Sequence, residues 1–147
     1  MSEGDEVTKG PVAGEPWRSE SIAELCKALA DCQRDIKNPK KARTANAGKF
    51  SYSYADIADV LACINEVAPK HGLAHAQVIR PNAEGRMCIF TLVMHTSGQW
   101  MQSEYRLPPA GDNHEMGGNI TYGRRYALAP MFGIASEDDT DFNGRHG

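Results

Sequence analysis

The sequence predicts an α+β domain, in which helices and a small antiparallel sheet occupy separate stretches of the chain. Two segments before residue 70 carry apolar residues at near-helical spacing, and a third such segment follows residue 118. Between them, from Leu73 to Leu107, the pattern changes to that of strands broken by two short turns. We therefore expect two N-terminal helices, a three-stranded meander and a C-terminal helix packed on the sheet.

The ends of the chain differ in charge from its body. Of the 16 basic and 19 acidic residues, three basic and nine acidic ones lie in residues 1–20 and 135–147, which leaves 13 basic and 10 acidic ones between. A length of 147 residues suits one domain. We expect a disordered acidic arm over 1–17, a folded domain over 18–134 and an acidic tail over 135–147. A mildly basic body between acidic ends favours interaction with nucleic acid.

The first two helices are predicted from their start signals and apolar stripes. Ser21 and Glu24 match an S-x-x-E capping box at the start of the first helix, and Asn38-Pro39 follows its end. The second helix is expected to begin after Ser53, and Pro69 predicts that it ends or kinks near Ala68. The two stripes are Ile22, Leu25, Leu29, Cys32 and Ile36, and then Ile57, Leu61, Ile64 and Val67.

Three strands are predicted next. "LAHAQVIR" and "RMCIFTLVMH" are separated by the turn "PNAEG", and "TSG" leads into "QWMQSEYRL". The second of these is apolar on both faces, which is typical of a central strand. Because both turns are short, the three strands should form an antiparallel meander.

The third helix is expected after a long loop over residues 108–118. Asn119 is its predicted N-cap, and Pro130 predicts that it ends by Ala129 or kinks. Gly123 weakens such a helix by up to about 1 kcal/mol relative to alanine. The residues expected to face the sheet are Ile120, Ala127, Leu128 and Met131.

Several kinds of chemistry lack a signal in the sequence. No nucleophile motif and no G-x-x-x-x-G-K-[ST] phosphate loop is present, so we expect no catalysis and no cofactor. The four cysteines form no C-x-x-C pair and are interpreted as buried, reduced thiols in a reducing cytosol. No signal peptide or membrane-length apolar run is visible, so we expect a cytoplasmic location and no membrane partner.

Nucleic-acid binding accounts for more of the unusual residues. A basic groove and aromatic faces are what a binder of single strands needs. Arg124 and Arg125, whose forked donors suit phosphate oxygens, lie between two tyrosines. Basic residues over 34–49 precede alternating aromatic residues, which share a face in an extended chain. The candidate DNA-binding residues are Lys40, Lys41, Arg43, Lys49, Tyr52, Tyr54, Tyr122, Arg124, Arg125 and Tyr126.

Three alternatives stay open at this point. In the first, one arginine pairs with a carboxylate such as Glu104, and the tyrosines pack on the sheet without contacting DNA. In the second, Asp138, Asp139 and Asp141 of the acidic tail hold a divalent cation, and the protein is a metal-dependent single-strand nuclease. In the third, the arginines form salt bridges to another protein, and the chain is a non-catalytic interaction module.

The same stretches resemble the Erf superfamily of phage single-strand DNA annealing proteins over residues 20–142. The resemblance is carried by "YADIADVLACINEVAPKHGL", by a strand ending in "HTSGQW" and by "GNITYGRRYAL" followed by "FGIASEDDTD". It implies binding of single-stranded DNA and annealing of complementary strands without ATP, in recombination and repair. It also implies a β-β-β-α core, a homo-oligomeric ring or filament, a bacterial host cytoplasm, and a host single-strand binding protein or a phage exonuclease as a candidate partner.

Overall fold

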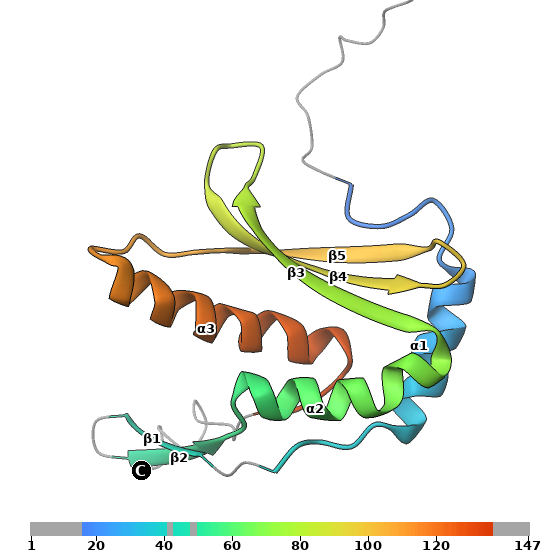
Figure 1. The fold of residues 1–147 in the computed structure, drawn as a ribbon, viewed down its shortest axis with the longest axis horizontal. Helices are drawn as coiled ribbons and strands as arrows, with labels where there is room; N and C mark the ends of the chain where they lie inside the picture. Colours follow the sequence, from blue (N-terminus) through green and yellow to red (C-terminus); the bar gives the residue numbers. More distant parts are fainter. Residues whose placement is uncertain (1–15, 41–42, 48–49, 137–147) are drawn as a thin grey trace, which may run out of the picture.

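The protein has the predicted α+β architecture with one added hairpin. A computed structural model describes residues 16–40, 43–47 and 50–136, and for most of residues 43–54 it describes the backbone only. Figure 1 shows the elements in chain order. They are α1 (Ala23–Asp35), β1 (Arg43–Ala47), β2 (Phe50–Tyr54), α2 (Ile57–Val67), a 3₁₀ helix η2 (Ala68–His71), β3 (Leu73–Pro81), β4 (Met87–His95), β5 (Trp100–Arg106) and α3 (Asn113–Met131).

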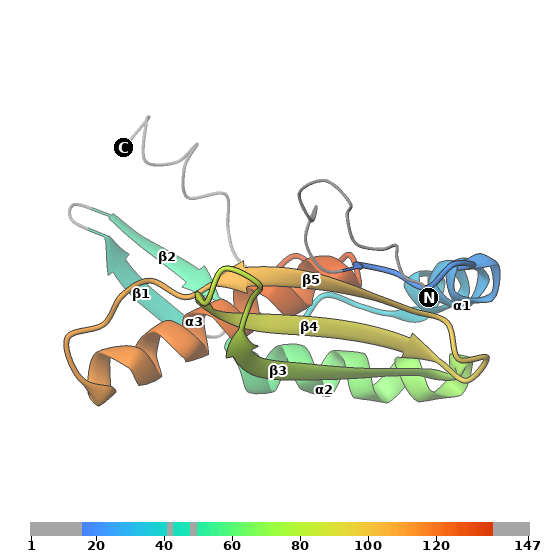
Figure 2. The same cartoon turned by 90° about the horizontal axis from the view of Figure 1, so that it is seen from above.

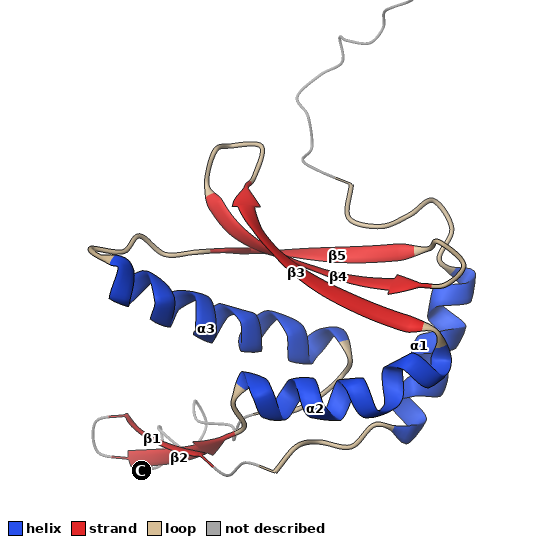
Figure 3. Cartoon of the chain, viewed as in Figure 1, coloured by secondary structure: helices blue, strands red, loops and turns tan. Residues whose placement is uncertain are grey.

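The main sheet is the predicted meander, with antiparallel strands in the order β3-β4-β5 (Figure 3). β4 is central, as its two apolar faces predict, and Ile89 and Val93 on one face and Cys88 and Phe90 on the other are buried. Direct partners lie on the same face of a sheet. The pairing of Ile89 with Tyr105 therefore places Tyr105 on the face that α3 covers.

The helices lie on one side of this sheet. α1 and α3 contact the strands, whereas α2 packs on α3 and is followed directly by η2. Seen from the side, the sheet, α3 and α2 form successive layers (Figure 1). Leu25 from α1, Ile64 from α2, Val93 from β4, Leu128 from α3 and Phe132 after it belong to one buried cluster.

The start of α1 differs from the predicted capping box. The N-cap is Ile22 and makes no side-chain cap bond, while Ser21 Oγ lies 3.5 Å from the backbone nitrogen of Ala23. Gln99, in the turn between β4 and β5, accepts a hydrogen bond from the Leu25 backbone N–H at 2.9 Å. The cap thus comes from a residue 74 positions away, which a local motif does not reveal.

α2 begins three residues later than predicted. Asp56 is its N-cap and forms a reciprocal capping box with Asp59, since each side chain accepts from the other's backbone N–H at 2.9 and 3.1 Å. Ser53 belongs instead to β2. The end of α2 agrees with the prediction: Val67 is its last residue, Pro69 lies within η2, and Gly72 adopts a left-handed backbone with φ 73°.

α3 is longer than predicted at both ends. It starts at Asn113, with Asp112 accepting from the Glu115 backbone N–H at 2.8 Å, so the second half of the expected loop is helical. The D-x-x-E pattern was a usable start signal that the neighbouring glycines obscured. The helix runs through Pro130 to Met131, so the missing N–H and the crowding of the ring against the Tyr126 carbonyl are confined to its last turn.

The β1–β2 hairpin was not predicted. Its strands are antiparallel and form a separate two-stranded sheet inserted between α1 and α2. Residues 43–47 are small or polar and carry no strand pattern, so the alternating Phe50, Tyr52 and Tyr54 had no recognisable pairing partner in the sequence. Backbone pairing therefore decides this element.

Both ends of the folded part are tied down by backbone hydrogen bonds. The Gln102 N–H donates to the Trp17 carbonyl at 2.7 Å and the Ser19 N–H to the Trp100 carbonyl at 2.9 Å, with a β-bridge between Arg18 and Met101. The segment 16–19 thus covers the free edge of β5. At the other end, the Ala55 N–H donates to the Ser136 carbonyl at 2.9 Å.

Candidate nucleic-acid interface

The candidate residues of α3 are oriented by Gly123. A Cβ at this position would lie 2.7 Å from Tyr105 Cε1 and 2.8 Å from Ile89 Cδ1, so the helix touches the sheet here through its backbone. Successive residues of a helix are about 100° apart. Tyr122 and Arg124 consequently leave the helix on opposite flanks, and Arg125 leaves it on the side away from the sheet.

A tyrosine cluster occupies the flank next to β5. The rings of Tyr122 and Tyr126 are stacked, with centroids 5.4 Å apart and planes inclined by 16°. Tyr105 of β5 meets Tyr126 edge to face at 6.2 Å. Tyr122 is 45% and Tyr126 is 55% exposed. The tyrosines thus pack on the sheet edge and still present aromatic surface to solvent, which combines both sequence-based interpretations.

Arg125 is almost enclosed. Only 8% of it is exposed, and its guanidinium carbon lies 5.5 Å from the centre of the Tyr122 ring. A cation over a tyrosine face is attracted by the ring quadrupole, so this contact also orients Tyr122. Arg125 and the tyrosine pair therefore form one unit, which we call the tyrosine flank: Tyr105, Tyr122, Arg125 and Tyr126. Its DNA contact stays a prediction.

Arg124 lies on the other flank, next to β3. Its Nε–H donates to Gln77 Oε1 at 3.2 Å, and Gln77 Nε2 donates in turn to the Arg124 carbonyl at 3.0 Å and to Thr91 Oγ1 at 3.0 Å. Thr91 is completely buried. The structure therefore separates the two adjacent arginines.

The register of the hairpin gathers part of the remaining candidates. Arg43 pairs with Tyr54, Ala45 with Tyr52 and Ala47 with Phe50, so one hairpin face carries an arginine and three aromatic residues. This confirms that the alternating aromatic residues share a face. Lys40 is exposed just before β1, whereas Lys41 and Lys49 lie outside the described residues.

The hairpin lies apart from the main sheet, beyond the layers of α3 and α2 (Figure 1). Seen from above, β1 and β2 extend beyond the β5 side of the sheet, while β3 forms the opposite edge (Figure 2). Tyr105, on β5, is the strand residue that contacts the tyrosine pair.

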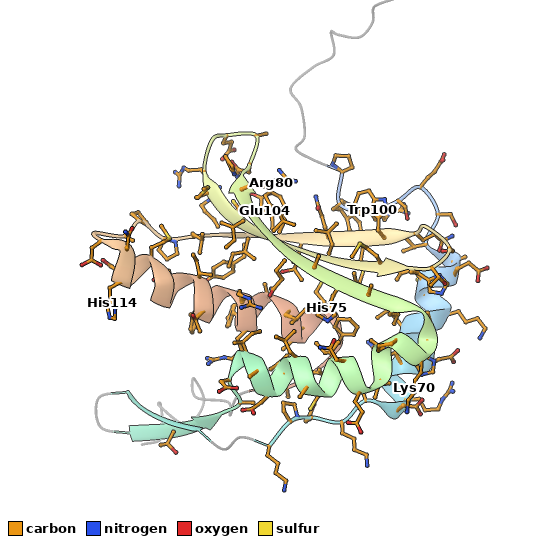
Figure 4. All side chains as sticks on the ribbon, in the orientation of Figure 1. Lys70, His75, Arg80, Trp100, Glu104 and His114 are labelled. Carbon is orange, nitrogen blue, oxygen red and sulfur yellow. The ribbon has the colours of Figure 1, made fainter. Side chains whose placement is uncertain are left out.

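A salt bridge between Glu104 and the α3 arginines does not fit the sheet. Glu104 follows Ser103 and precedes Tyr105, so it faces away from α3. There its carboxylate accepts from Asn82 Nδ2 at 2.7 Å, and Arg80 lies nearby with its guanidinium 3.8 Å over the Phe90 ring (Figure 4). Glu104 is therefore not the carboxylate partner of either arginine.

The cysteines differ from one another. All four are free thiols; Cys32 and Cys88 are buried, Cys63 is half-buried and Cys26 is exposed, so the expectation of burial is wrong for Cys26. Burial raises the pKa of Cys32, Cys63 and Cys88, and the Glu104 carboxylate raises that of Cys88 further. These three thiols are poor nucleophiles.

The described part of the chain shows no metal site. It contains no group of three or more His, Cys, Asp or Glu residues arranged to hold an ion. The acidic run with Asp138, Asp139 and Asp141 lies outside the described residues. Among the described helices, none has the length and apolar character that a membrane span requires.

A family model described as the ERF superfamily matches residues 25–147. The chain belongs to the ERF superfamily. No curated protein and no solved structure matches the chain. The superfamily is one of phage single-strand DNA annealing and recombination proteins. This ERF protein thus carries the α+β architecture and the tyrosine–arginine helix on which the resemblance rested.

Two residues of the ERF protein's candidate interface were missed at the level of sequence. Tyr105 lies in the third predicted strand, but nothing local placed it beside Tyr126. Gln77 is an ordinary polar residue in a strand, and only the packing of α3 brings it to Arg124. No sequence signal identifies either contact, because both join elements that are far apart in the chain.

Proposed function

We propose that this ERF-superfamily chain binds single-stranded DNA and anneals complementary strands without ATP in homologous recombination. The observation that carries the proposal is the exposed, stacked pair Tyr122–Tyr126 with the Arg125 guanidinium against it. Exposed aromatic faces suit the stacking of unpaired bases without sequence preference, and the enclosed Arg125 holds the Tyr122 ring in place for it.

The hairpin supplies the second aromatic surface in this proposal. In the register of the hairpin Arg43 pairs with Tyr54, and Tyr52 lies two residues away on the same strand, so these three candidates share one face. Exposed Lys40, with Lys41 and Lys49 nearby in sequence, adds positive charge. Each base–aromatic contact of this kind contributes about 1–3 kcal/mol.

Annealing then requires no bond chemistry from the protein. Two DNA strands repel each other through their phosphates, and arginine and lysine side chains reduce that repulsion. Bases held by one face keep their pairing edges accessible. The protein therefore acts by concentrating and extending strands, which is why we propose neither ATP nor another cofactor.

Assembly into a homo-oligomer is part of the proposal. The contact surface of one small domain is short, so side-by-side protomers would gain affinity through avidity along one strand. We further propose that the protein works in the cytoplasm of a bacterial host, with a host single-strand binding protein or a phage exonuclease as its protein partner.

Annealing of two complementary oligonucleotides, one with a donor and one with an acceptor fluorophore, tests the function. We expect annealing by the purified chain without ATP and in the presence of EDTA. If about four phosphates are neutralised per protomer, the logarithm of the affinity for a single strand should fall with the logarithm of salt concentration with a slope near −3. A flat salt dependence would contradict the proposal.

The same samples separate the rival functions. A metal-dependent nuclease would shorten a labelled single strand when Mg²⁺ is added, and EDTA would stop it. A protein-interaction module would leave both the annealing rate and the mobility of the single strand unchanged. Either result replaces the proposed function.

A further inference from the structure

We infer that Gln77 positions Arg124 as a phosphate-binding residue, on a flank of α3 separate from the tyrosine flank. The inference rests on the proposed function, because it takes the anion to be a DNA backbone phosphate. It starts from an unusual feature of the pair: the charged side chain of Arg124 is oriented by a neutral amide rather than by a carboxylate.

The amide of Gln77 is held in one orientation. Its Nε2 donates to Thr91 Oγ1 and to the Arg124 carbonyl, each at 3.0 Å, and its Oε1 accepts from Arg124 Nε at 3.2 Å. If the amide were rotated by 180°, Oε1 would face the Arg124 carbonyl oxygen, and two acceptors would meet. The buried Thr91 thus anchors the amide, and the amide anchors the arginine.

This arrangement uses one of the five guanidinium N–H groups. The Arg124 bond to Gln77 comes from Nε. Among the described residues no acceptor engages the Nη1 and Nη2 groups of Arg124. These two groups form the fork that binds two oxygens of a phosphate. Gln77 therefore fixes the stem of the side chain and leaves the fork available.

Gln77, the hydrogen-bond partner of Arg124, is uncharged, and this matters for the binding of an anion. Arg34 and Arg106 lie beside carboxylates, with Nη2 3.3 Å from Asp31 and 3.4 Å from Glu84. A carboxylate orients an arginine but also offsets its charge. The amide of Gln77 provides orientation alone, and among the described residues no carboxylate offsets the charge of Arg124 beside β3.

The location implies a second line of contact. Arg124 contacts β3 through Gln77, whereas Tyr126 contacts Tyr105 on β5, and β4 lies between those two strands. The two flanks are thus separated by the width of α3. Contacts on them should contribute independently to DNA binding, because they share no partner.

Four variants test the inference by fluorescence anisotropy with a labelled oligo-dT strand at several salt concentrations. Gln77→Glu introduces a carboxylate that competes with phosphate, so affinity should fall about tenfold and the salt slope should become shallower by about 0.7. Arg124→Gln should do the same.

Gln77→Met keeps the charge and loses the orientation, so affinity should fall about threefold with the slope unchanged. Arg86→Gln removes an exposed arginine remote from this site and is the matched control.

The double variant gives the decisive comparison. Gln77→Glu should cost nothing further in an Arg124→Gln background, because its effect passes through the arginine. Tyr126→Leu should instead add its full cost in that background. The melting temperature of Gln77→Met should equal that of the wild type, which shows that the variant is folded. If Gln77→Glu does not fold, the affinity of Gln77→Met is used for the test instead.

Two outcomes overturn the inference. One is a Gln77→Glu affinity equal to that of the Arg86→Gln control. The other is a Gln77→Glu loss that persists in the Arg124→Gln background, which shows a merely structural role. Failure of the wild-type protein to bind oligo-dT is a different result, and it refutes the proposed function itself.

Discussion

Gly123 of α3 lies so close to Tyr105 of β5 that a Cβ on the glycine would stand 2.7 Å from the tyrosine ring. A glycine in a helix ordinarily costs stability, and this one was interpreted from the sequence as a weak point. The structure gives it a purpose, since it lets α3 approach the sheet and brings Tyr126 to Tyr105.

Gly123→Ala should therefore destabilise the fold, against its helix propensity. Overpacking of this kind costs about 1–3 kcal/mol, which chemical denaturation followed by circular dichroism measures. Gly118→Ala, in the same helix with nothing within 4 Å of its Cβ position, is the control and should stabilise by up to about 1 kcal/mol. Equal effects of both substitutions would contradict the close contact.

Removal of one exposed ring should weaken DNA binding without loss of charge. We expect Tyr126→Ala to lower the affinity for a single strand by about 1–3 kcal/mol, while Tyr126→Phe keeps the stacking surface and stays near wild type. Anisotropy titration measures both. Equal affinities of Tyr126→Ala and Tyr126→Phe would remove the stacking role.

Truncation of the acidic ends should tighten DNA binding at low salt, because negatively charged segments compete with DNA for basic residues. The hydrogen bonds of Trp17 and Ser136 set the limits, so the deletions should cover residues 1–15 and 137–147 only. Affinity measured at two salt concentrations checks this. Unchanged or weaker binding would assign the ends a passive role.

Deletion through residue 19 should in addition expose the β5 edge and promote association, visible by light scattering.

The start of α1 should depend on a distant glutamine. Gln99→Ala removes the acceptor of the Leu25 N–H and should cost about 1 kcal/mol. Thermal melting measures the loss. Gln33→Ala, which removes an exposed amide from the body of α1 itself, is the matched control and should have little effect. If Gln99→Ala melts like that control, the cap is not significant.

Stability should decline in mildly acidic solution partly because of His75. Burial lowers its pKa below the ordinary 6.5, and its Nε2 lies 2.9 Å from Asn65 Oδ1. Between the folded and unfolded pKa values the unfolded chain binds more protons, so stability decreases as the pH falls from about 6.5. His75→Gln should show a smaller drop in melting temperature between about pH 7.5 and about pH 5.5. If the melting temperature of His75→Gln drops as much as that of the wild type, or if His71→Gln abolishes the drop instead, a group other than His75 causes the effect.

The local elements were largely determined by the sequence itself. The helical stripes, the meander and the central position of β4 follow from apolar periodicity, because each pattern is satisfied within its own segment. The end of α2 before Pro69 follows from the covalent structure of proline. The family resemblance, carried by ordered local motifs, was confirmed over residues 25–147.

The tertiary structure alone decided how the candidate interface is divided. Arg124 and Arg125 are neighbours in the chain, yet helix geometry and the contact at Gly123 direct one toward β3 and bury the other beside Tyr122. The hairpin, the Gln99 cap and the Gln77 amide likewise depend on pairs of residues that local motifs do not join. Periodicity reports which face of one element is apolar. It contains no information on which polar group of another element will meet that face, since that depends on packing.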